Sequence, residues 1–492
     1  MNFNPGDLYG VLPALLLAAG ALVLLTSEVF LRPVEPDRRY QAWVAAAFAF
    51  AGLWASLAQL GDPAQPLFAG AAVSDGFAHI VAAVVCAALF LSCIVAFSYL
   101  ESLRATRGEF YALALFSASG MCLLAQATDL VVIFISLEVM SLAVYALCAY
   151  LRRGKRPAEA AFKYFILGSF ASAIFLYGAA FAFGASGSTR LADLAATVRS
   201  GSATTLVYAS AALLAAGFAF KVAAVPFHMW VPDVYDGAPA PVTGFMAAGV
   251  KAAAFATLVR ILVSGYGEGG RWRGLIVALA YLTMLVGNLL AVPQRSVKRM
   301  LAYSSIAHAG YLLVAVAAMG TSAPRADAAG ALLFYLASYG ATVIGAFAVV
   351  AIIERKLALS GLGDDLSSWA GLSEKHPALA AAMSLFMISL AGVPPTAGFM
   401  AKLTVFRSAI EADLVPLAIF GVITSVAGLY YYLRVVVYVY MVPEAKADAV
   451  QGGRLLSAGL AIAGCALIVL WMGVLPGSFA ALAQSGAAVF GR

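Results

Sequence analysis

Long apolar stretches recur along the whole chain, and they constrain its fold more than any other feature. Each is close to the roughly 20 residues that a helix needs to cross a bilayer. The chain has 492 residues, 63% of them hydrophobic and 11% charged, which is more apolar surface than a soluble domain buries. We therefore predict an all-α polytopic membrane protein with about fourteen transmembrane helices, centred on residues 8–31, 41–60, 77–99, 109–127, 129–150, 162–185, 205–225, 240–264, 274–293, 297–319, 327–353, 377–410, 414–440 and 455–475.

Positive residues are distributed unevenly between the two sides of the predicted bundle. The loops after odd-numbered spans hold 17 Lys and Arg residues, including the segment RRGKR at 152–156, and the opposite side holds 7. Because basic loops stay in the cytoplasm, both termini are expected on the outer side. No basic face outside these loops suits nucleic acid, so a nucleic-acid partner is not expected.

Proline interrupts the seventh and the twelfth span. The first interruption is FKVAAVPFHMWVPDVYDGAPAPV, with breaks predicted at Pro226 and again near Pro232, and the second is AGVPPTAGF, which holds Pro394 and Pro395. Proline disrupts the helix before it, and such backbone is tolerated at membrane depth only where it is buried in protein or lines a wet cavity. The breaks lie five spans apart, which predicts two inverted five-helix repeats, spans 4–8 and 9–13. We expect the first three transmembrane helices in residues 1–105, the first repeat in 106–266, the second repeat in 267–442 and the C-terminal transmembrane helix in 443–492.

Ionisable residues inside the predicted spans are functional candidates, because each costs several kcal/mol at bilayer depth. Glu138 is the only acidic residue in the middle of a span. Lys221 precedes Pro226 by five residues, and Lys251 and Lys402 each lie at least two helical turns past a proline. Burial disfavours a charged ammonium while a nearby carboxylate favours it, so such lysines can exchange protons. A structural ion pair or a snorkelling side chain is the alternative for each.

Other polar residues in the spans give weaker signals. Lys163 is a further relay candidate, although Glu159 lies one turn before it and a local i,i+4 pair would also account for it. Arg260 and Arg434 lie nearer to span ends and are more typical of snorkelling anchors. His228 lies beside the first break and divides evenly between a relay role and a structural one.

His308 shares one helix face with Ser304 and Tyr311, at the spacing i, i+4 and i+7. This pattern favours a water-bearing relay over a packing histidine. The four histidines fall on separate segments and the five cysteines form no CxxC pair, so no metal site and no cofactor-binding site is expected in this chain. The chemistry that these residues support is proton movement.

The segment FKVAAVPFHMWVPDVYDGAPAPVTGFMAAGVKAAAF, together with SLEVMSLAVYAL, resembles the antiporter-like membrane subunits of complex I, the NADH-quinone oxidoreductase. The resemblance covers nearly the whole chain. It is strongest to the N type, because the long lateral helix of the L type is missing and Lys402 stands where the M type is expected to have a glutamate.

The resemblance implies roles for the candidate residues. Glu138 and Lys221 would form a pair that tunes the protonation of the lysine. Protons would enter from the cytoplasm, pass along Lys221, Lys251 and Lys402, and leave on the periplasmic side of a bacterial inner membrane. Further relay positions would be matched by Lys163 and His308.

The resemblance also implies partners and cofactors. FMN, iron–sulfur clusters, NADH and quinone would belong to partner subunits, and the neighbours in the membrane would be of the K and M types, with lipid, internal water and protons around the chain. Two alternatives stay open. A subunit of a multi-subunit Na⁺/H⁺ antiporter or of a membrane-bound hydrogenase shares the segment 220–251, and a non-conducting scaffold would need none of the four intramembrane lysines.

Overall fold

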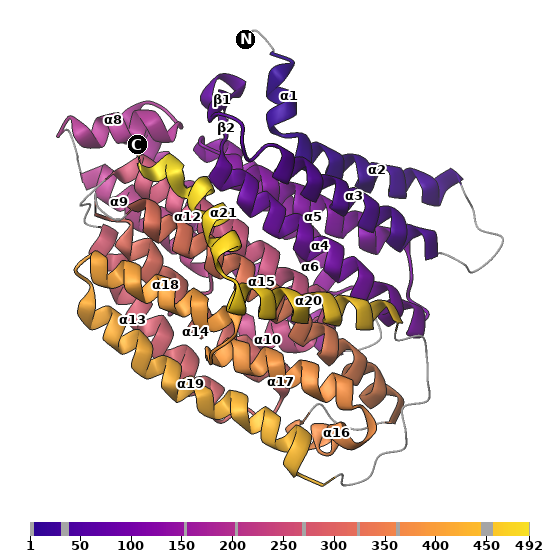
Figure 1. The fold of residues 1–492 in the computed structure, drawn as a ribbon. Coiled ribbons are helices and arrows are strands. Elements are labelled where there is room, and N and C mark those ends of the chain that lie inside the picture. The colour runs from indigo at the N-terminus through magenta and orange to yellow at the C-terminus, as the bar shows by residue number, and fades with distance from the viewer. Residues whose placement is uncertain are drawn as a thin grey trace.

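A computed structural model describes residues 4–30, 39–151, 155–201, 205–267, 272–321, 325–360, 365–443 and 456–491. Long helices run side by side through the whole molecule (Figure 1). Twelve helical segments of the described chain are long and apolar enough to cross a membrane. They are α2 (Leu12–Phe30), α3 (Arg39–Ala58), α4 (Gly76–Ser102), α5 (Gly108–Gln126), α6 (Leu130–Cys148), α7 (Lys155–Ser186), the segment Ala240–Gly265, α13 (Trp272–Ala291), α14 (Val297–Ala318), α15 (Arg325–Ser360), α19 (Val415–Met441) and α20 (Leu456–Val474).

Shorter elements continue these helices or connect them. The segment Ala240–Gly265 is one continuous helix with two π-helical stretches, built from α11 (Ala240–Phe245), η2 (Met246–Val250), α12 (Lys251–Val259) and η3 (Arg260–Gly265). The other short elements are α1 (Gly6–Gly10), β1 (Gln65–Leu67), η1 (Phe68–Gly70), β2 (Ala72–Ser74), α8 (Leu191–Arg199), α9 (Thr205–Lys221), α10 (Trp230–Gly237), η4 (Leu366–Trp369), α16 (Leu372–Lys375), α17 (Pro377–Ala391), α18 (Ala397–Glu411), α21 (Gly477–Ala487) and η5 (Ala488–Gly491).

The prediction of two discontinuous helices is confirmed. The first consists of α9 and α10, with Pro226 in the interruption between them, and the second consists of α17 and α18, separated by a turn that holds Pro394 and Pro395. The prediction of a further break near Pro232 is wrong. Pro232 lies in the first turn of α10, where a backbone N–H has no partner within the helix and its loss costs nothing.

One end of the bundle carries most of the extramembrane structure. The β1–β2 hairpin, α8 and α21 all lie there, whereas α16 lies at the opposite end (Figure 1). The hairpin pairs Gln65 with Ser74 in antiparallel register, and the backbone N–H of Thr128 donates to Ala71 O at 3.0 Å beside it. Sequence periodicity did not predict this hairpin, because strands of three residues are too short to show alternation.

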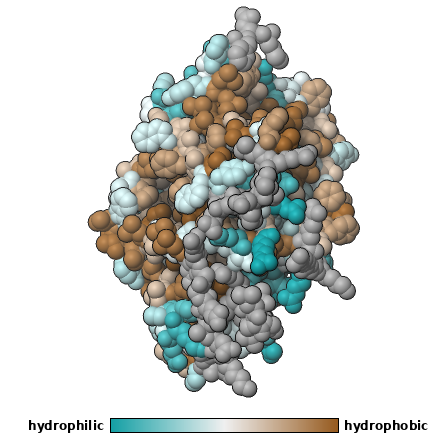
Figure 2. Space-filling model, turned by 90° about the vertical axis from the view of Figure 1, so that its right-hand side faces the viewer, coloured by the Kyte–Doolittle hydropathy of each residue, from teal (hydrophilic) through white to brown (hydrophobic). Residues whose placement is uncertain are grey.

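The most deeply buried helices lie in the middle of the bundle. Every residue in the best 18-residue apolar window of Ala240–Gly265 is buried, as are 94% of those in α14 and α15, against 33% in α2, α7 and α20. The outer helices instead expose large hydrophobic side chains, and hydrophobic residues cover broad areas of the face in Figure 2. A core that carries polar groups inside an apolar shell suits a membrane protein whose function is internal.

Residues 152–154 of the basic segment RRGKR lie outside the described residues.

A buried ion pair joins the ends of three helices near the hairpin. Arg260 Nη2 lies 2.7 Å from Asp75 Oδ1, and the two side chains are only 4% and 2% exposed. Arg260 Nε also donates to Ala125 O at 2.6 Å, while Asp75 caps α4 by accepting from the N–H of Ala78. The interpretation of Arg260 as a snorkelling anchor is therefore wrong, because its charge is neutralised inside the protein.

We expect Asp75→Asn to destabilise the protein by about 2 kcal/mol, since the amide still caps α4 but leaves the charge of Arg260 unpaired. The measurement is the thermal unfolding midpoint of the purified chain in detergent, which should fall. Asp129→Asn is the matched control, because Asp129 caps α6 in the same way but bonds the Thr189 hydroxyl instead of a cation. Equal midpoints for both variants would contradict a role for the ion pair.

Candidate functional site

Lys221 is the last residue of α9 and lies directly before the first interruption, with its side chain 3% exposed. Its Nζ donates to Ser141 Oγ at 2.9 Å and to Tyr145 OH at 3.1 Å, both on α6. Tyr145 fits there only because α7 has a glycine at position 168, where a Cβ would overlap the tyrosine hydroxyl. The lysine is thus held by two hydroxyl groups in the protein interior.

Glu138 lies on the same face of α6, one turn before Ser141. Its Oε1 accepts from Ser172 Oγ on α7 at 2.5 Å, and the side chain is only partly buried. Both Glu138 and Lys221 are described, and no direct ion pair joins them. In this conformation each group bonds a neighbouring hydroxyl, and a pair that tunes the protonation of Lys221 by opening and closing stays a prediction.

Lys251 lies at the transition from η2 to α12, in the fully buried helix. Such π-helical segments occur frequently at functional sites. Its Nζ donates to both the carbonyl and the hydroxyl oxygen of Ser305 on α14, each at 2.6 Å. The same Nζ lies 4.7 Å from the centroid of the Tyr339 ring on α15. Only neutral oxygens and an aromatic face surround this amine in the described contacts.

His308 is held between two tyrosine hydroxyls. Its Nδ1 lies 2.6 Å from Tyr335 OH on α15, and its Nε2 lies 3.1 Å from Tyr432 OH on α19. Ser304 is hydrogen-bonded to the same Tyr432 hydroxyl. Because a neutral imidazole donates through one nitrogen and accepts through the other, this ring can exchange donor and acceptor roles with both tyrosines. Ser304 and His308 thus share a network, as their spacing predicted.

Lys402 fills the second helix interruption. Its Nζ donates to the carbonyl oxygens of Leu390 and Ala391, both at 2.9 Å, and to Ser425 Oγ at 2.8 Å. These carbonyls end α17, and the last turn of a helix has no backbone donors for them. The lysine therefore donates to carbonyls that the helix interruption leaves without backbone donors, and these carbonyls in turn accept hydrogen bonds from the buried amine. Tyr311 completes the site, since its ring centroid lies 5.1 Å from the lysine Nζ.

Protein side chains connect Lys251 with Lys402 almost continuously. The Tyr339 ring, which faces Lys251, lies 5.0 Å from the imidazole of His308. From His308 the contacts continue through the Tyr432 hydroxyl, the Tyr431 ring at 4.4 Å from that of Tyr432, the Asn288 amide at 3.1 Å from Tyr431 OH, and the Tyr311 hydroxyl at 3.2 Å from Asn288. Four helices contribute to this connection.

The contacts between Lys221 and Lys251 are mainly aromatic. Lys221 Nζ lies 5.7 Å from the Tyr164 ring, which stacks on Trp230 at 4.3 Å. Trp230 lies 6.3 Å from the Tyr235 ring, and the Tyr235 hydroxyl lies 3.3 Å from Ser305 Oγ, the partner of Lys251. A series of contacting side chains therefore links the two lysines, and most of its contacts are between aromatic rings and not hydrogen bonds.

Lys163 and His228 lie apart from these groups. Lys163 Nζ lies 2.8 Å from both Glu159 and Asp233, and Asp233 also binds Arg299 at 3.0 Å. The Lys163 side chain is 41% exposed, so its environment is an ion cluster at the end of the bundle. The i,i+4 pair with Glu159 is present, as the alternative interpretation stated. His228 is 7% exposed and lies in the turn between α9 and α10.

Sequence reasoning missed several polar residues of the core. Ser305, Tyr335, Tyr339 and Tyr432 contact the candidate lysines or histidine, but hydroxyl groups on mainly apolar helices give no distinct hydropathy signal. Lys298 was counted with a basic loop, yet it is 1% exposed and pairs with Glu354 at 3.1 Å. Its position on the second residue of a strongly apolar helix was the available signal.

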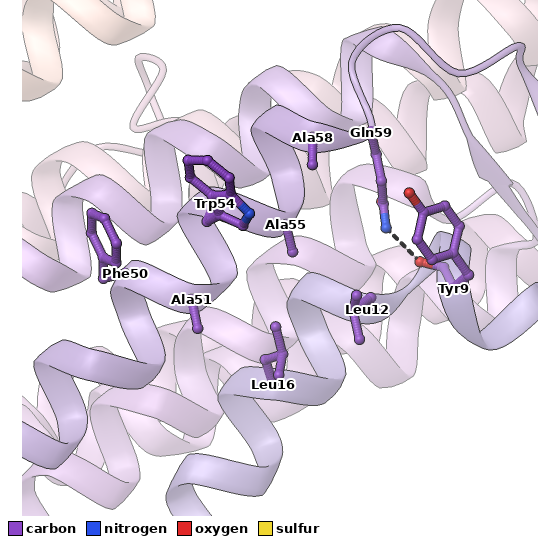
Figure 3. Close-up of a pocket in the computed structure, with 9 residues that line it drawn as sticks. All are labelled: Tyr9, Leu12, Leu16, Phe50, Ala51, Trp54, Ala55, Ala58 and Gln59. Atoms are coloured by element: carbon purple, nitrogen blue, oxygen red, sulfur yellow. Dashed lines mark hydrogen bonds between the residues drawn. The ribbon is translucent and has the colours of Figure 1, made fainter.

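A groove on the N-terminal helices is lined by none of these residues. This groove of about 460 Å³ lies between the N-terminal helices and α3, lined by Tyr9, Leu12, Phe50, Trp54 and Gln59 among others (Figure 3). Its apolar walls and its position on the outer helices suit contact with lipid. Among the described residues, no group of three His, Cys, Asp or Glu side chains is placed to hold a metal ion.

Comparison with known sequences identifies relatives that match the whole chain. Residues 127–428 match the family described as NADH:quinone oxidoreductase/Mrp antiporter, TM. A relative from Myxococcus xanthus, named NADH-quinone oxidoreductase subunit N, is 46% identical over 100% of this chain and 99% of its own. One of the same name from Trichlorobacter lovleyi is 41% identical over 90% of this chain and 89% of its own.

Solved structures share the fold. A chain of respiratory complex I from Thermus thermophilus with bound aureothin has a TM-score of 0.80 and 34% identity, covering 96% of this chain and 100% of that one. A chain of the Mrp complex from Dietzia sp. DQ12-45-1b has a TM-score of 0.83 at 24% identity, covering 98% of each. The second likeness shows the fold alone, so the fold does not separate the two kinds of complex.

Proposed function

Because this chain belongs to the family of NADH-quinone oxidoreductase N subunits, we propose that it is a proton-translocating subunit in the membrane arm of a respiratory NADH:quinone oxidoreductase. The observation that carries the proposal is the connected set of buried groups from Lys251 through His308 to Lys402. Uncompensated amines in an apolar core are costly, and each can become neutral by giving up its proton. A static seal would gain nothing from them.

In the proposed mechanism, protons move along the row of lysines. Lys221 takes up a proton from the cytoplasmic side, beside the backbone that the first interruption frees. The proton passes to Lys251, then through His308 and its tyrosine partners to Lys402, which releases it outward. Each transfer needs only hydroxyl groups, an imidazole or water, all of which can donate and accept.

Glu138 is proposed to control Lys221. A carboxylate favours the charged form of a nearby amine. Ser141, which bonds Lys221, lies one turn from Glu138 on the same face of α6. Movement of Glu138 from Ser172 toward Ser141 would favour the charged lysine, and movement back would release its proton. We assign His228 to the cytoplasmic entrance of the path that leads to Lys221. Lys163, in its exposed ion cluster, belongs to the same entrance and not to the central row of lysines.

The proposal includes partners and location. NADH, FMN, iron–sulfur clusters and quinone belong to partner subunits, and this chain contributes no redox site. Glu138 is only half-buried between exposed apolar residues of α6, including Ile135 and Leu142, which supports a neighbouring membrane subunit on that face. Neighbours of the K and M types, both termini on the periplasmic side of the inner membrane, and two inverted repeats over spans 4–8 and 9–13 are parts of the same proposal.

The alternative is a subunit of a multi-subunit Na⁺/H⁺ antiporter or of a membrane-bound hydrogenase. The shared fold is compatible with this alternative, whereas the sequence identity to N-type relatives along the full chain favours the respiratory complex. Purification of the native complex decides between them. Flavin and iron–sulfur subunits in the preparation would support our proposal, and small membrane subunits alone would contradict it.

We expect Lys221→Ala and Glu138→Gln each to lower the proton-to-electron ratio and, several-fold, the coupled turnover, while the complex still assembles. The lysine is the proposed carrier, and the glutamine keeps the hydrogen bond of Ser172 but not the charge. Proton uptake is measured in vesicles that contain the purified complex, with NADH oxidation followed in parallel. Wild-type ratios and rates in both variants would contradict the proposed function.

A further inference from the structure

A fourth buried lysine of the described chain lies outside the row of candidate residues. Lys298, near the start of α14, is 1% exposed, and its Nζ donates to Ala238 O at 2.8 Å and to Glu354 Oε1 at 3.1 Å. Glu354 lies near the end of α15 and is 28% exposed. The pair therefore connects a fully buried amine with the surface, at the membrane end that the basic loops assign to the cytoplasm.

Glu354 is the centre of this contact. Its Oε2 accepts from Tyr99 OH on α4 at 3.1 Å and from the N–H of Ala240, the first residue of α11, at 3.4 Å. The titratable groups that contact it from neighbouring elements are thus Lys298 and Tyr99. Four helices meet at one carboxylate, and one of them begins the segment that carries Lys251.

The geometry leads from this pair toward Lys251. Lys298 and Ser305 are seven residues apart on one face of α14, about 10 Å along its axis. Ser305 is the residue that holds Lys251 Nζ. The end of α10 packs against α14 here: Ala238, which follows α10, accepts the Lys298 hydrogen bond, and Tyr235, one turn earlier, lies 3.3 Å from Ser305 Oγ. Both helices therefore contact Lys298 at one point and the Ser305 partner of Lys251 at another.

We propose that Glu354 and Lys298 form a second proton inlet, which supplies Lys251 without passing through Lys221. The Lys298 ammonium, which donates to the Glu354 carboxylate, passes a proton along the hydroxyls of Tyr235 and Ser305 to the neutral amine of Lys251. Glu354 then takes a proton from cytoplasmic water and gives it to the Lys298 amine, which restores the ion pair. This inference rests on the proposed function, since it assigns a source to one member of the same row.

The test uses the purified complex in vesicles with Glu354→Gln and Glu354→Ala. The side-chain oxygen of glutamine can still accept from Tyr99 and Ala240, while the exchangeable carboxyl group is lost. We expect coupled turnover to fall several-fold at pH 8.5 and little at pH 6.5, because an inlet limits the rate where protons are scarce. Added formate, a small weak acid, should restore turnover in Glu354→Ala. Wild-type rates at all pH values, or an equal loss at all pH values without rescue, would overturn the inlet.

Two controls separate this inference from the proposed function. Glu374→Gln removes an exposed carboxylate from α16, at the same end of the bundle, and should leave turnover unchanged. Lys251→Ala is measured in parallel. If Lys251→Ala pumps normally, the proposed function fails, and if it is impaired while both Glu354 variants behave as wild type, only the inlet fails.

Discussion

Replacement of Lys251 by alanine is expected to reduce redox-coupled proton pumping and coupled turnover about tenfold, which corresponds to ~1.4 kcal/mol in the barrier. Lys251 is the one candidate with contacts toward both sides of the proposed row, to Ser305 on one side and to the Tyr339 ring next to His308 on the other. Its loss should interrupt transfer without disturbing assembly, because alanine suits the buried helix well. The measurement is the proton-to-electron ratio of the reconstituted complex.

Lys251→Arg separates proton exchange from charge. Arginine keeps the positive charge but does not release its proton at any accessible pH, so this variant should stay impaired. Lys375→Ala is the control for loss of a lysine, since Lys375 is exposed on α16. Normal pumping by Lys251→Arg would mean that the residue acts only as a fixed charge.

Gly398→Ala is expected to prevent assembly of the complex. Gly398 is the second residue of α18, and a Cβ at this position would overlap the carbonyl oxygen of Ser389 in the last turn of α17. Backbone atoms cannot move aside as a flexible side chain can, so the cost should reach or exceed the upper end of the roughly 1–3 kcal/mol of ordinary overpacking. The two halves of the broken helix would separate, and the carbonyl contacts of Lys402 would be lost with them.

The amount of assembled complex in native gels of membranes measures this effect. Gly464→Ala on α20 is the matched control, because a Cβ there meets no atom within 4 Å. It should assemble as wild type, since alanine favours a helix over glycine. Equal assembly of the two variants would contradict the close contact between α17 and α18.

Hydropathy predicted the helices well, for a physical reason. A segment that crosses a bilayer must be long, apolar and internally hydrogen-bonded, so its sequence carries the signal by itself. The fourteen predicted spans each coincide with a helix or with a discontinuous pair in the described residues. Proline marked the interruptions for the same reason, although Pro232 shows that proline at the start of a helix is no break.

The arrangement of the candidate site was less predictable, because its partners lie far apart in the sequence. His308 bonds tyrosines from α15 and α19, and Lys298 bonds a glutamate 56 residues later. Such contacts depend on how helices pack, which the period of a single helix does not report. Burial of Lys298 was missed for this reason.

The most direct test of the proposed path is a high-resolution electron cryomicroscopy map of the assembled, active complex with its ordered water molecules. We expect a chain of waters and polar side chains that connects Lys221 to Lys251 past Tyr164 and Tyr235, and then follows His308 to Lys402. A dry contact of apolar side chains between Lys251 and either neighbouring lysine, in every state that the enzyme adopts during turnover, would contradict it.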